Sequence, residues 1–232
     1  MHNSPTIVIQ ARMSSSRLPG KMLKHINGKP VLTYVIERLQ HCKNNKSLIV
    51  ATSIDETDND IQQLCDSLRI PCFRGSLNNV VERFSSLVAS KNIDSFVRIS
   101  GDSPMIDYKL VDYAISLFNQ NQCDIVTNLF PRSYPKGQSI EVLRSGVFNS
   151  AIPDITLDDD KEHLSTFFYR HPDRFNIMNF TMDPVSSHIQ LSIDTMKDFT
   201  DLTAIISSMD KSHYLYGLNE IMFLKESLSE TI

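Results

Sequence analysis

The sequence predicts a three-layer α/β fold, in which helices cover both faces of a mostly parallel sheet. The main observation is an alternation from residue 6 to residue 127, where short apolar runs are followed by segments with one apolar helical face. Such alternation is typical of strands joined by helical crossovers. The 232 residues can also bury a large core, so we expect a single domain over residues 1–232.

The expected elements of this first part follow one another with short connections. We expect strands at the β-branched run that begins at Thr6 and at residues 47–52, 71–73, 95–100 and 123–127. We expect helices from Pro30, whose ring suits a first turn, and at residues 58–68, 78–90 and 108–119. Asp107 precedes the last of these helices, and we expect it to act as the N-cap.

The pattern changes after residue 128. We expect residues 129–187 to form a small inserted lobe that shapes a second substrate's pocket or a dimer contact, with a strand at 139–143. A helix should start at the acidic triplet 158–160, because acids favour a helix N-terminus. Residues 187–193 alternate like a strand that returns to the sheet, and a helix should follow Thr195. The tail from Gly217 is expected to be one amphipathic helix.

The composition excludes several classes of protein. No apolar run is long enough to span a bilayer and no signal-peptide pattern is present, so we expect a cytoplasmic enzyme without a membrane partner. The net charge of −4 and the absence of a basic stripe beyond the first loop argue against a nucleic-acid partner. The four cysteines lack Cys-x-x-Cys spacing, so we expect reduced thiols rather than disulfides or zinc ligands; they are Cys42, Cys65, Cys72 and Cys123.

A basic loop follows the first strand. Arg12, Arg17 and Lys21 stand among serines, and no acid occurs before Glu37 although the whole chain is acidic. Guanidinium groups, an ammonium group and hydroxyl groups in one loop are suited to a phosphate-rich ligand. The spacing is not that of a Walker loop. The alternative is a solvated surface loop without a ligand.

An aspartate follows the strand at 95–100, in the sequence Gly101-Asp102-Ser103-Pro104. Ligands of open α/β sheets bind at the carboxyl ends of the strands, so Asp102 and the basic loop should meet in one crevice. Mg²⁺ prefers one or two carboxylates together with substrate phosphates, which makes Asp102 a candidate metal ligand. The alternative is an aspartate that only stabilises its own turn.

Several motifs carry a resemblance to a known family. The specific ones are Gln10-Ala11-Arg12-Met13, Ser16-Arg17-Leu18-Pro19-Gly20-Lys21, Gly28-Lys29-Pro30-Val31-Leu32, Phe73-Arg74-Gly75-Ser76 and Arg98-Ile99-Ser100-Gly101-Asp102-Ser103-Pro104-Met105-Ile106-Asp107. Looser matches are Tyr134-Pro135-Lys136-Gly137, Glu162-His163 and Ser192-Ile193-Asp194-Thr195. Over most of residues 6–205 the chain thereby resembles the SpsF-like cytidylyltransferases, which are related to acylneuraminate and KDO cytidylyltransferases.

The resemblance implies a Rossmann-like nucleotidyltransferase fold, a homodimer and a set of site residues. Arg12, Arg17, Lys21 and Asp102 would be catalytic, and Asp102 and Asp194 would hold Mg²⁺, although Asp194 could equally cap the helix after it. The nucleotide would be bound by Gln10, Ala11, Arg12, Ser16, Arg17, Lys21, Arg74, Gly75, Ser76 and Asp102. The acceptor would be bound by Tyr134, Gln138, Glu141 and His163, and by Arg98 unless Arg98 only pairs with an acid.

The function that follows is transfer of CMP from CTP to an acidic sugar for a surface polysaccharide, with release of pyrophosphate. Two alternatives stay open. A glycosyltransferase that consumes a nucleotide sugar would need the triplet at 158–160 beside the nucleotide. A non-catalytic nucleotide-binding protein would bind CTP without turnover.

Overall fold

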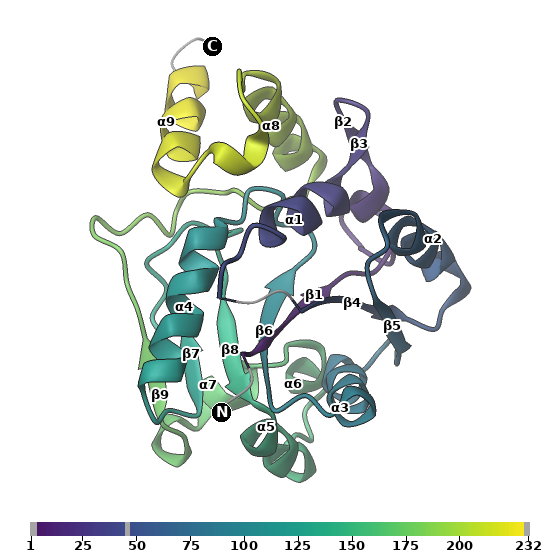
Figure 1. The fold of residues 1–232 in the computed structure, drawn as a ribbon, viewed down its shortest axis with the longest axis vertical. Coiled ribbons are helices and arrows are strands. Elements are labelled where there is room, and N and C mark those ends of the chain that lie inside the picture. Colours follow the sequence, from purple (N-terminus) through teal and green to yellow (C-terminus); the bar gives the residue numbers. More distant parts are fainter. Residues whose placement is uncertain (1–3, 45–46, 230–232) are drawn as a thin grey trace.

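Seven strands form one sheet with helices on both faces in a computed structural model, which describes residues 4–44 and 47–229 (Figure 1). The strand order is β5-β4-β1-β6-β8-β7-β9. The strands are β1 (Thr6–Gln10), β4 (Leu48–Ser53), β5 (Cys72–Gly75), β6 (Ser95–Ser100), β7 (Ile125–Thr127), β8 (Glu141–Arg144) and β9 (Ile177–Asn179). Within this sheet, β8 pairs antiparallel with β6 and β7, and the other pairings are parallel. The predicted three-layer, mostly parallel fold is confirmed.

Helices cover both faces of the sheet (Figure 1). They pack on it through two separate hydrophobic cores, one on each face. One face carries α1 (Val31–Leu39), α2 (Asn59–Leu68) and α4 (Tyr108–Gln120). The helices α8 (Met196–Ser207) and α9 (Leu218–Ser229) lie beyond one end of the sheet (Figure 1) and share the core of this face. The other carries α3 (Val80–Lys91), α5 (Ser145–Ala151), α6 (Asp158–Glu162) and α7 (Thr166–Arg170). Along β1, Ile7 and Ile9 belong to the first core and Val8 to the second. This alternation follows from the two-residue period of a strand.

Short elements complete the chain. They are the 3₁₀ turns η1 (Lys21–Leu23), η2 (Glu56–Asp58), η3 (Ile152–Asp154), η4 (Pro172–Arg174) and η5 (His213–Leu215), and the hairpin strands β2 (His25–Ile26) and β3 (Lys29–Pro30). Asn27 and Gly28 join the two hairpin strands with φ angles of 47° and 78°. Such a pair of positive φ angles matches the right-handed twist of a tight hairpin.

The predicted strand at 187–193 is wrong. Only Gln190 makes a bridge, to Lys136, and the strand that extends the sheet is β9, which we did not predict. Leu191 and Ile193 are buried as their alternation suggests. Their backbone N–H groups, however, donate to the carbonyl groups of Lys136 (2.8 Å) and Asp102 (2.9 Å), which lie in loops. The segment therefore ties two loops together rather than adding a strand.

The predicted helix from residue 158 is also different, because it is broken into α6 and α7. His163 ends α6 with φ −112° and ψ 88°, outside the helical region. The segment 129–187, expected as an inserted lobe, contributes β8 between β6 and β7 and β9 at the edge of the sheet. The tail forms α9 as expected, and residues 230–232 of that prediction lie outside the described residues.

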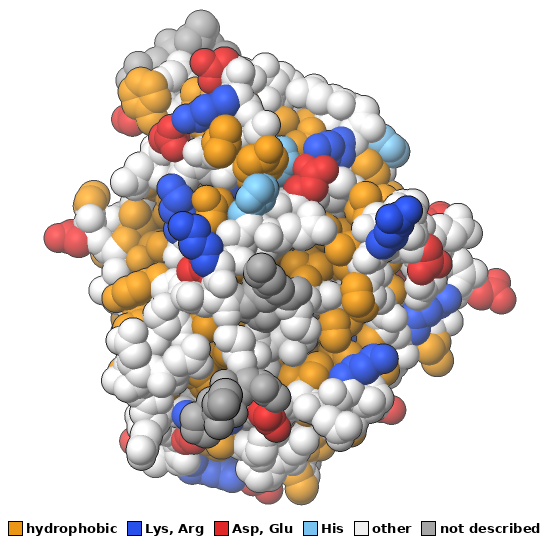
Figure 2. All heavy atoms as spheres, viewed as in Figure 1, with side chains coloured by type: hydrophobic (Ala, Val, Ile, Leu, Met, Phe, Trp, Pro, Cys, Tyr) orange, Lys and Arg blue, Asp and Glu red, His pale blue; other side chains and the backbone are white. Residues whose placement is uncertain are grey.

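A buried arginine fixes the C-terminal segment against the body. The Arg38 side chain is fully buried and donates to the carbonyl groups of Ile106, His213 and Tyr216. Burial lowers the pKa of Arg38 to about 10, so the guanidinium stays charged at neutral pH. At this end of the molecule hydrophobic side chains reach the surface over α9 (Figure 2), and Phe223 is 68% exposed.

The hydrophobic cores form without a disulfide crosslink. All four cysteines are free; Cys42, Cys65 and Cys123 are buried and Cys72 is partly buried. Among the helices of the described residues, none combines the length and apolar character required to cross a membrane.

We expect Gly137→Ala to destabilise the protein by about 2 kcal/mol or more. Gly137 has a φ of 93°, and a Cβ there would lie 2.5 Å from the backbone carbon of Leu191, in the segment that leads to Asp194. Urea denaturation measures the free energy of unfolding. Gly146→Ala is the matched control, because that glycine lies in α5 with open space around it. This variant should be more stable than the wild type, since alanine favours a helix over glycine. Equal effects of the two variants would contradict the close approach at Gly137.

We also expect part of the pH dependence of stability to come from His213. Burial lowers the pKa of His213 although its ring nitrogen lies 2.7 Å from Glu37. The unfolded chain therefore binds more protons below about pH 6.5, and stability is lost as the pH falls from there toward the folded-state pKa. Between pH 7.5 and 5.5 the wild type should lose up to about 1 kcal/mol more unfolding free energy than His213→Gln. The exposed His25→Gln is the control; identical pH profiles for all three proteins would exclude His213 as the cause.

Candidate active site

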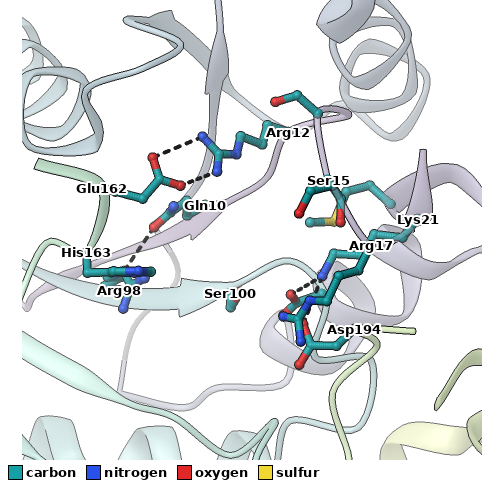
Figure 3. A pocket seen from close by; sticks show the side chains of 14 residues that line it. Gln10, Arg12, Ser15, Arg17, Lys21, Arg98, Ser100, Glu162, His163 and Asp194 are labelled. Atoms are coloured by element: carbon teal, nitrogen blue, oxygen red, sulfur yellow. Dashed lines mark hydrogen bonds and ion pairs between the residues drawn. The ribbon is translucent and has the colours of Figure 1, made fainter. Parts of the chain in front are cut away.

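The carboxyl ends of β1 and β6 open into a cavity of about 360 Å³ (Figure 3). Its lining is polar and comes from four distant parts of the chain. The lining residues are Gln10, Arg12, Ser14, Ser15, Ser16, Arg17, Lys21, Met22, Arg98, Ser100, Asp102, Glu162, His163 and Asp194. The predicted crevice between the basic loop and Asp102 is therefore present, at the strand ends where ligands of α/β sheets bind.

The basic loop after β1 is held by a buried carboxylate. Asp58 accepts from the backbone N–H of Met13 (2.7 Å) and from the N–H of Ser53 (3.0 Å), which joins the loop to the end of β4. Gly20 closes the loop with a φ of 70°, and its N–H donates to the Met13 carbonyl (3.0 Å). Only a residue that tolerates the left-handed region fits there without strain. The loop cations thus project from a fixed backbone.

Lys21 lies at the centre of one end of the cavity. Its ammonium nitrogen is 2.6 Å from Asp102 Oδ2, 2.6 Å from the Ile193 carbonyl oxygen and 3.5 Å from Asp194 Oδ1. The Lys21 residue is only 6% exposed. Arg17, which is exposed, reaches the same Asp194 oxygen at 2.9 Å. Two carboxylates and a carbonyl group therefore surround one cation.

This arrangement fits the expected pair of metal-binding aspartates. Thr195 caps α8, in a capping box with Asp198, so the alternative that Asp194 is the N-cap is wrong. The oxygens around Lys21 already stabilise a positive charge, and Mg²⁺ needs only one or two carboxylates beside substrate phosphates. In the described part of the chain, no group of three or more His, Cys, Asp or Glu side chains could hold a metal alone. Asp102 and Asp194 suit a cation that arrives with phosphates.

Arg12 is paired across the mouth of the cavity with Glu162, the last residue of α6 (Figure 3). Both guanidinium end nitrogens contact the Glu162 carboxylate, one of them at 3.2 Å. We did not assign Glu162 to the site from the sequence, although it stands beside His163 in a motif of the family resemblance. Its position directly before His163 was the signal available.

At the other end of the cavity a row of polar side chains crosses three strands. Arg98 in β6 donates through Nε to Gln10 Oε1 (2.9 Å) and through Nη1 to Glu141 Oε2 (2.6 Å) in β8. The second Glu141 oxygen accepts from the hydroxyl groups of Ser165 and Tyr169. Burial, and then the charge of Glu141, raises the pKa of Tyr169 well above its usual value, so its phenol remains a donor.

Four predicted nucleotide ligands lie outside the cavity lining, namely Ala11, Arg74, Gly75 and Ser76. Arg74 donates to the carbonyl groups of Ser53 (2.8 Å) and Asp55 (2.7 Å), and it contacts the side chain of Asn59. It therefore braces the turn after β4. Gly75 packs so tightly that a Cβ would lie 2.9 Å from Arg83, and the carbonyl of Ser76 accepts from Arg83 (2.8 Å). Ala11 is likewise buried behind the cavity, at 1% exposure.

Three predicted acceptor ligands lie outside the cavity lining: Tyr134, Gln138 and Glu141, whose buried carboxylate accepts from Arg98, Ser165 and Tyr169. Gln138 is fully buried; it accepts from the N–H of Asp107 (2.9 Å) and donates to the Met105 carbonyl (2.7 Å). Its amide therefore links the loop after β6 to the loop before β8. Tyr134 is 7% exposed and packs on Phe180. Neither residue lines the cavity, whereas Arg98 and His163 do.

The three aspartates at 158–160 form ion pairs within the protein. Arg170 contacts Asp159 (2.6 Å) and Asp160 (2.7 Å), and Lys161 contacts Asp158 (2.9 Å). None of the three acids lines the cavity, so the triplet ties α6 to α7. Asp107 caps α4 as predicted, by accepting from the N–H of Lys109 (2.9 Å).

A basic loop that meets Asp102 and Asp194 beside the carboxyl edge of such a sheet is suited to a ligand with phosphate groups, as a nucleotidyltransferase requires. Residues 6–226 match the profile of the family described as Cytidylyltransferase. The chain belongs to this cytidylyltransferase family.

Individual relatives agree with this assignment. The spore coat polysaccharide biosynthesis protein SpsF of Bacillus subtilis is 28% identical over 211 residues, which is 88% of this chain and 86% of SpsF. A 3-deoxy-manno-octulosonate cytidylyltransferase of Alteromonas mediterranea is 31% identical over 172 residues, 72% of this chain and 63% of that enzyme. A cytidylyltransferase structure from Leptospira borgpetersenii superposes with a TM-score of 0.91 at 28% identity, and the match covers 99% of this chain and 95% of the other.

The Arg12–Glu162 pair should compete with anion binding. Because the negative charge of Glu162 beside Arg12 opposes the binding of a phosphate there, we expect Glu162→Gln to lower the Kd for inorganic tripolyphosphate about three- to tenfold, the effect of losing one partly buried ion pair. Titration calorimetry measures the affinity. Glu56→Gln, an exposed acid outside the cavity, is the control. Unchanged or weaker binding by Glu162→Gln would show that Arg12 does not exchange Glu162 for phosphate.

Proposed function

We propose that the chain transfers CMP from CTP to a hydroxyl group of an acidic sugar and releases pyrophosphate, for the synthesis of a surface polysaccharide. The observation that carries this proposal is the cluster of Arg17, Lys21, Asp102 and Asp194 at one end of the cavity. Two relatives support the substrate class: SpsF acts in polysaccharide biosynthesis, and the Alteromonas enzyme is named for an acidic sugar.

In the proposed reaction the acceptor oxygen forms a bond to the α-phosphorus of CTP. The bond from that phosphorus to the bridging oxygen of the β-phosphate breaks, pyrophosphate leaves with the electron pair of that bond, and the hydroxyl proton passes to water. Arg12, Arg17 and Lys21 would hold the triphosphate and stabilise the charge that develops on the departing pyrophosphate. Such positioned cations supply most of the rate enhancement in transfer to or from phosphate groups.

Asp102 and Asp194 would hold Mg²⁺ together with the phosphates. When bound, the ion would withdraw charge from the phosphate oxygens and help align the nucleotide with the acceptor. Lys21 would then exchange an aspartate partner for a phosphate oxygen, because its ammonium group already lies between both carboxylates.

We propose that the acceptor approaches the cavity beside α6, where His163 and Glu162 line it. These residues belong to the segment 129–187 that we expected to shape the second substrate's pocket. The homodimer implied by the family resemblance stays an expectation.

Of the two alternatives, the glycosyltransferase is disfavoured by the triplet at 158–160, because its carboxylates pair with Arg170 and Lys161 outside the cavity. The binding-only alternative differs from the proposal in turnover, not in affinity. An assay of pyrophosphate release therefore distinguishes all three.

We expect Asp102→Asn to lower Mg²⁺-dependent pyrophosphate release by at least about 100-fold, because it removes a charge that balances the cations at the reacting phosphates. The assay compares CTP, UTP, ATP and GTP against a panel of nonulosonic and deoxy-sugar acids, and thermal melting checks the fold. Asp158→Asn is the matched control, since that side chain is 99% exposed.

Each other outcome has a definite meaning. Full activity of Asp102→Asn would remove Asp102 from the catalytic site. Loss of activity in Asp158→Asn alone would revive the glycosyltransferase alternative. Stable CTP binding without release for any acceptor would support the binding-only protein.

A further inference from the structure

Arg83 is a fully buried cation that we did not assign to the site from the sequence. It lies in α3 between the core side chains Val81 and Phe84, and it is 0% exposed. Charged side chains are rarely buried so completely unless a partner of opposite charge stabilises them. In the described part of the chain, however, Arg83 donates only to backbone carbonyl groups, and its Nη1 atom has no hydrogen-bond partner. An internal ion pair therefore does not explain this buried charge.

The Arg83 guanidinium group holds the connection between β5 and α3. Its Nε donates to the Ser76 carbonyl at 2.8 Å, and its Nη2 donates to the Leu77 carbonyl at 3.0 Å. The side chain passes close to Gly75, where a Cβ would lie 2.9 Å from Arg83 Cγ and 3.2 Å from Arg83 Cα. The planar guanidinium fork thus fixes two successive carbonyl groups, and a residue without a side chain leaves room for it.

The Leu77 carbonyl is shared with a cation of the cavity. Arg12 Nη1 donates to the same oxygen at 3.4 Å, and it contacts Glu162 at 3.2 Å (Figure 3). A carbonyl oxygen has two lone pairs and can accept from both guanidinium groups. Arg12 therefore has an uncharged anchor at Leu77 beside its charged anchor at Glu162.

The two guanidinium groups also influence each other electrostatically. Burial and then the charge of Arg12 lower the pKa of Arg83, whereas the charges of Asp58 and Glu162 raise it. A guanidinium group nevertheless stays protonated in proteins. Two positive charges thus share one carbonyl oxygen, whose partial negative charge offsets their repulsion. The position of this oxygen determines where Arg12 can lie beside a second cation.

We propose that Arg83 is a positioning residue for Arg12: it fixes the Leu77 carbonyl, which holds Arg12 at the mouth of the cavity in the conformation that binds a phosphate group. The inference rests on the proposed function in one respect, since it assumes that Arg12 binds phosphates of the substrate. When a phosphate replaces Glu162 as the partner of Arg12, the Leu77 carbonyl remains as an anchor. A long side chain that is already ordered loses less conformational entropy on binding. Arg83 itself does not line the cavity and touches no ligand.

A purely electrostatic contribution of Arg83 has a different signature. A lysine at position 83 keeps the positive charge but lacks the planar fork that binds two successive carbonyl groups. Arg83→Lys therefore retains the effect of the charge and removes the hold on Leu77.

The test is the Kd for inorganic tripolyphosphate, measured by titration calorimetry on the full chain in a double-mutant cycle with Arg12→Met. We expect Arg83→Lys to weaken binding about three- to tenfold, the cost of ordering one long side chain. In the Arg12→Met background the same substitution should change the Kd less than about twofold, because no guanidinium group is left to position. A general loss of stability would act in both backgrounds, so the cycle separates positioning from a merely structural role.

Gly75→Ala reaches the same side chain by another route and keeps the test decisive if Arg83→Lys does not fold. Its Cβ would displace Arg83, so tripolyphosphate binding should weaken with the same dependence on Arg12. Arg144→Lys is the matched control, because Arg144 also donates to a backbone carbonyl, that of Cys123 at 2.7 Å, and lies outside the cavity lining. This control should bind tripolyphosphate as the wild type does, and thermal melting reports the folding of each variant.

Three results would overturn the inference: a loss of less than threefold in Arg83→Lys, a loss of similar size in the Arg12→Met background, or an equal loss in Arg144→Lys. Unchanged binding by Arg12→Met alone would overturn both the inference and the phosphate-binding role of Arg12. Failure of the transfer reaction is recognised separately. A chain that shows the Arg12-dependent loss but never releases pyrophosphate would refute the proposed reaction and leave the positioning role of Arg83 intact.

Discussion

The ammonium group of Lys21 is the contact on which the arrangement of the site depends. It joins three parts of the chain that are far apart in sequence: the loop after β1, Asp102 after β6, and the segment with Ile193 and Asp194. Two partly buried carboxylates that face each other without a cation would be costly, because partial burial and mutual repulsion both penalise unpaired charge. Lys21 thus keeps two acids close together, and a site that can exchange the ammonium for a cation and phosphates follows from that constraint.

Much of the fold could be predicted because its first half obeys local rules. β1, β4 and β6 are apolar runs, and the helices between them have clear apolar faces. The later part was harder because its structure depends on distant contacts. Leu191 and Ile193 alternate like a strand, yet loop carbonyls accept their N–H groups. Nothing in the short run of β9 distinguishes it from a loop until it pairs with β7.

The functional site divides in the same way, into residues that local patterns predict and residues whose role depends on distant contacts. Spacing and chemistry predicted Arg12, Arg17, Lys21 and Asp102, which stand in the loop after β1 or directly after β6. The family resemblance added Asp194, and all five residues line the cavity. Arg74 and Gln138 were expected in the site, but their side chains already form hydrogen bonds with backbone groups of the protein. A sequence does not show whether a polar side chain forms hydrogen bonds within the protein or stays available to a ligand. Glu162 was not predicted, because its place in the site depends on an ion pair with Arg12, which is far from it in the sequence.

Every cation of the basic loop already has a carboxylate partner, and this balance has a consequence for ligand binding. Arg12, Arg17 and Lys21 are paired with Glu162, Asp194 and Asp102. A phosphate that approaches these cations also meets the negative charge of the three carboxylates. A divalent cation that arrives with the phosphates would neutralise Asp102 and Asp194 and remove much of that repulsion. The charge balance of the site thus favours a ligand that carries phosphates and a metal ion together.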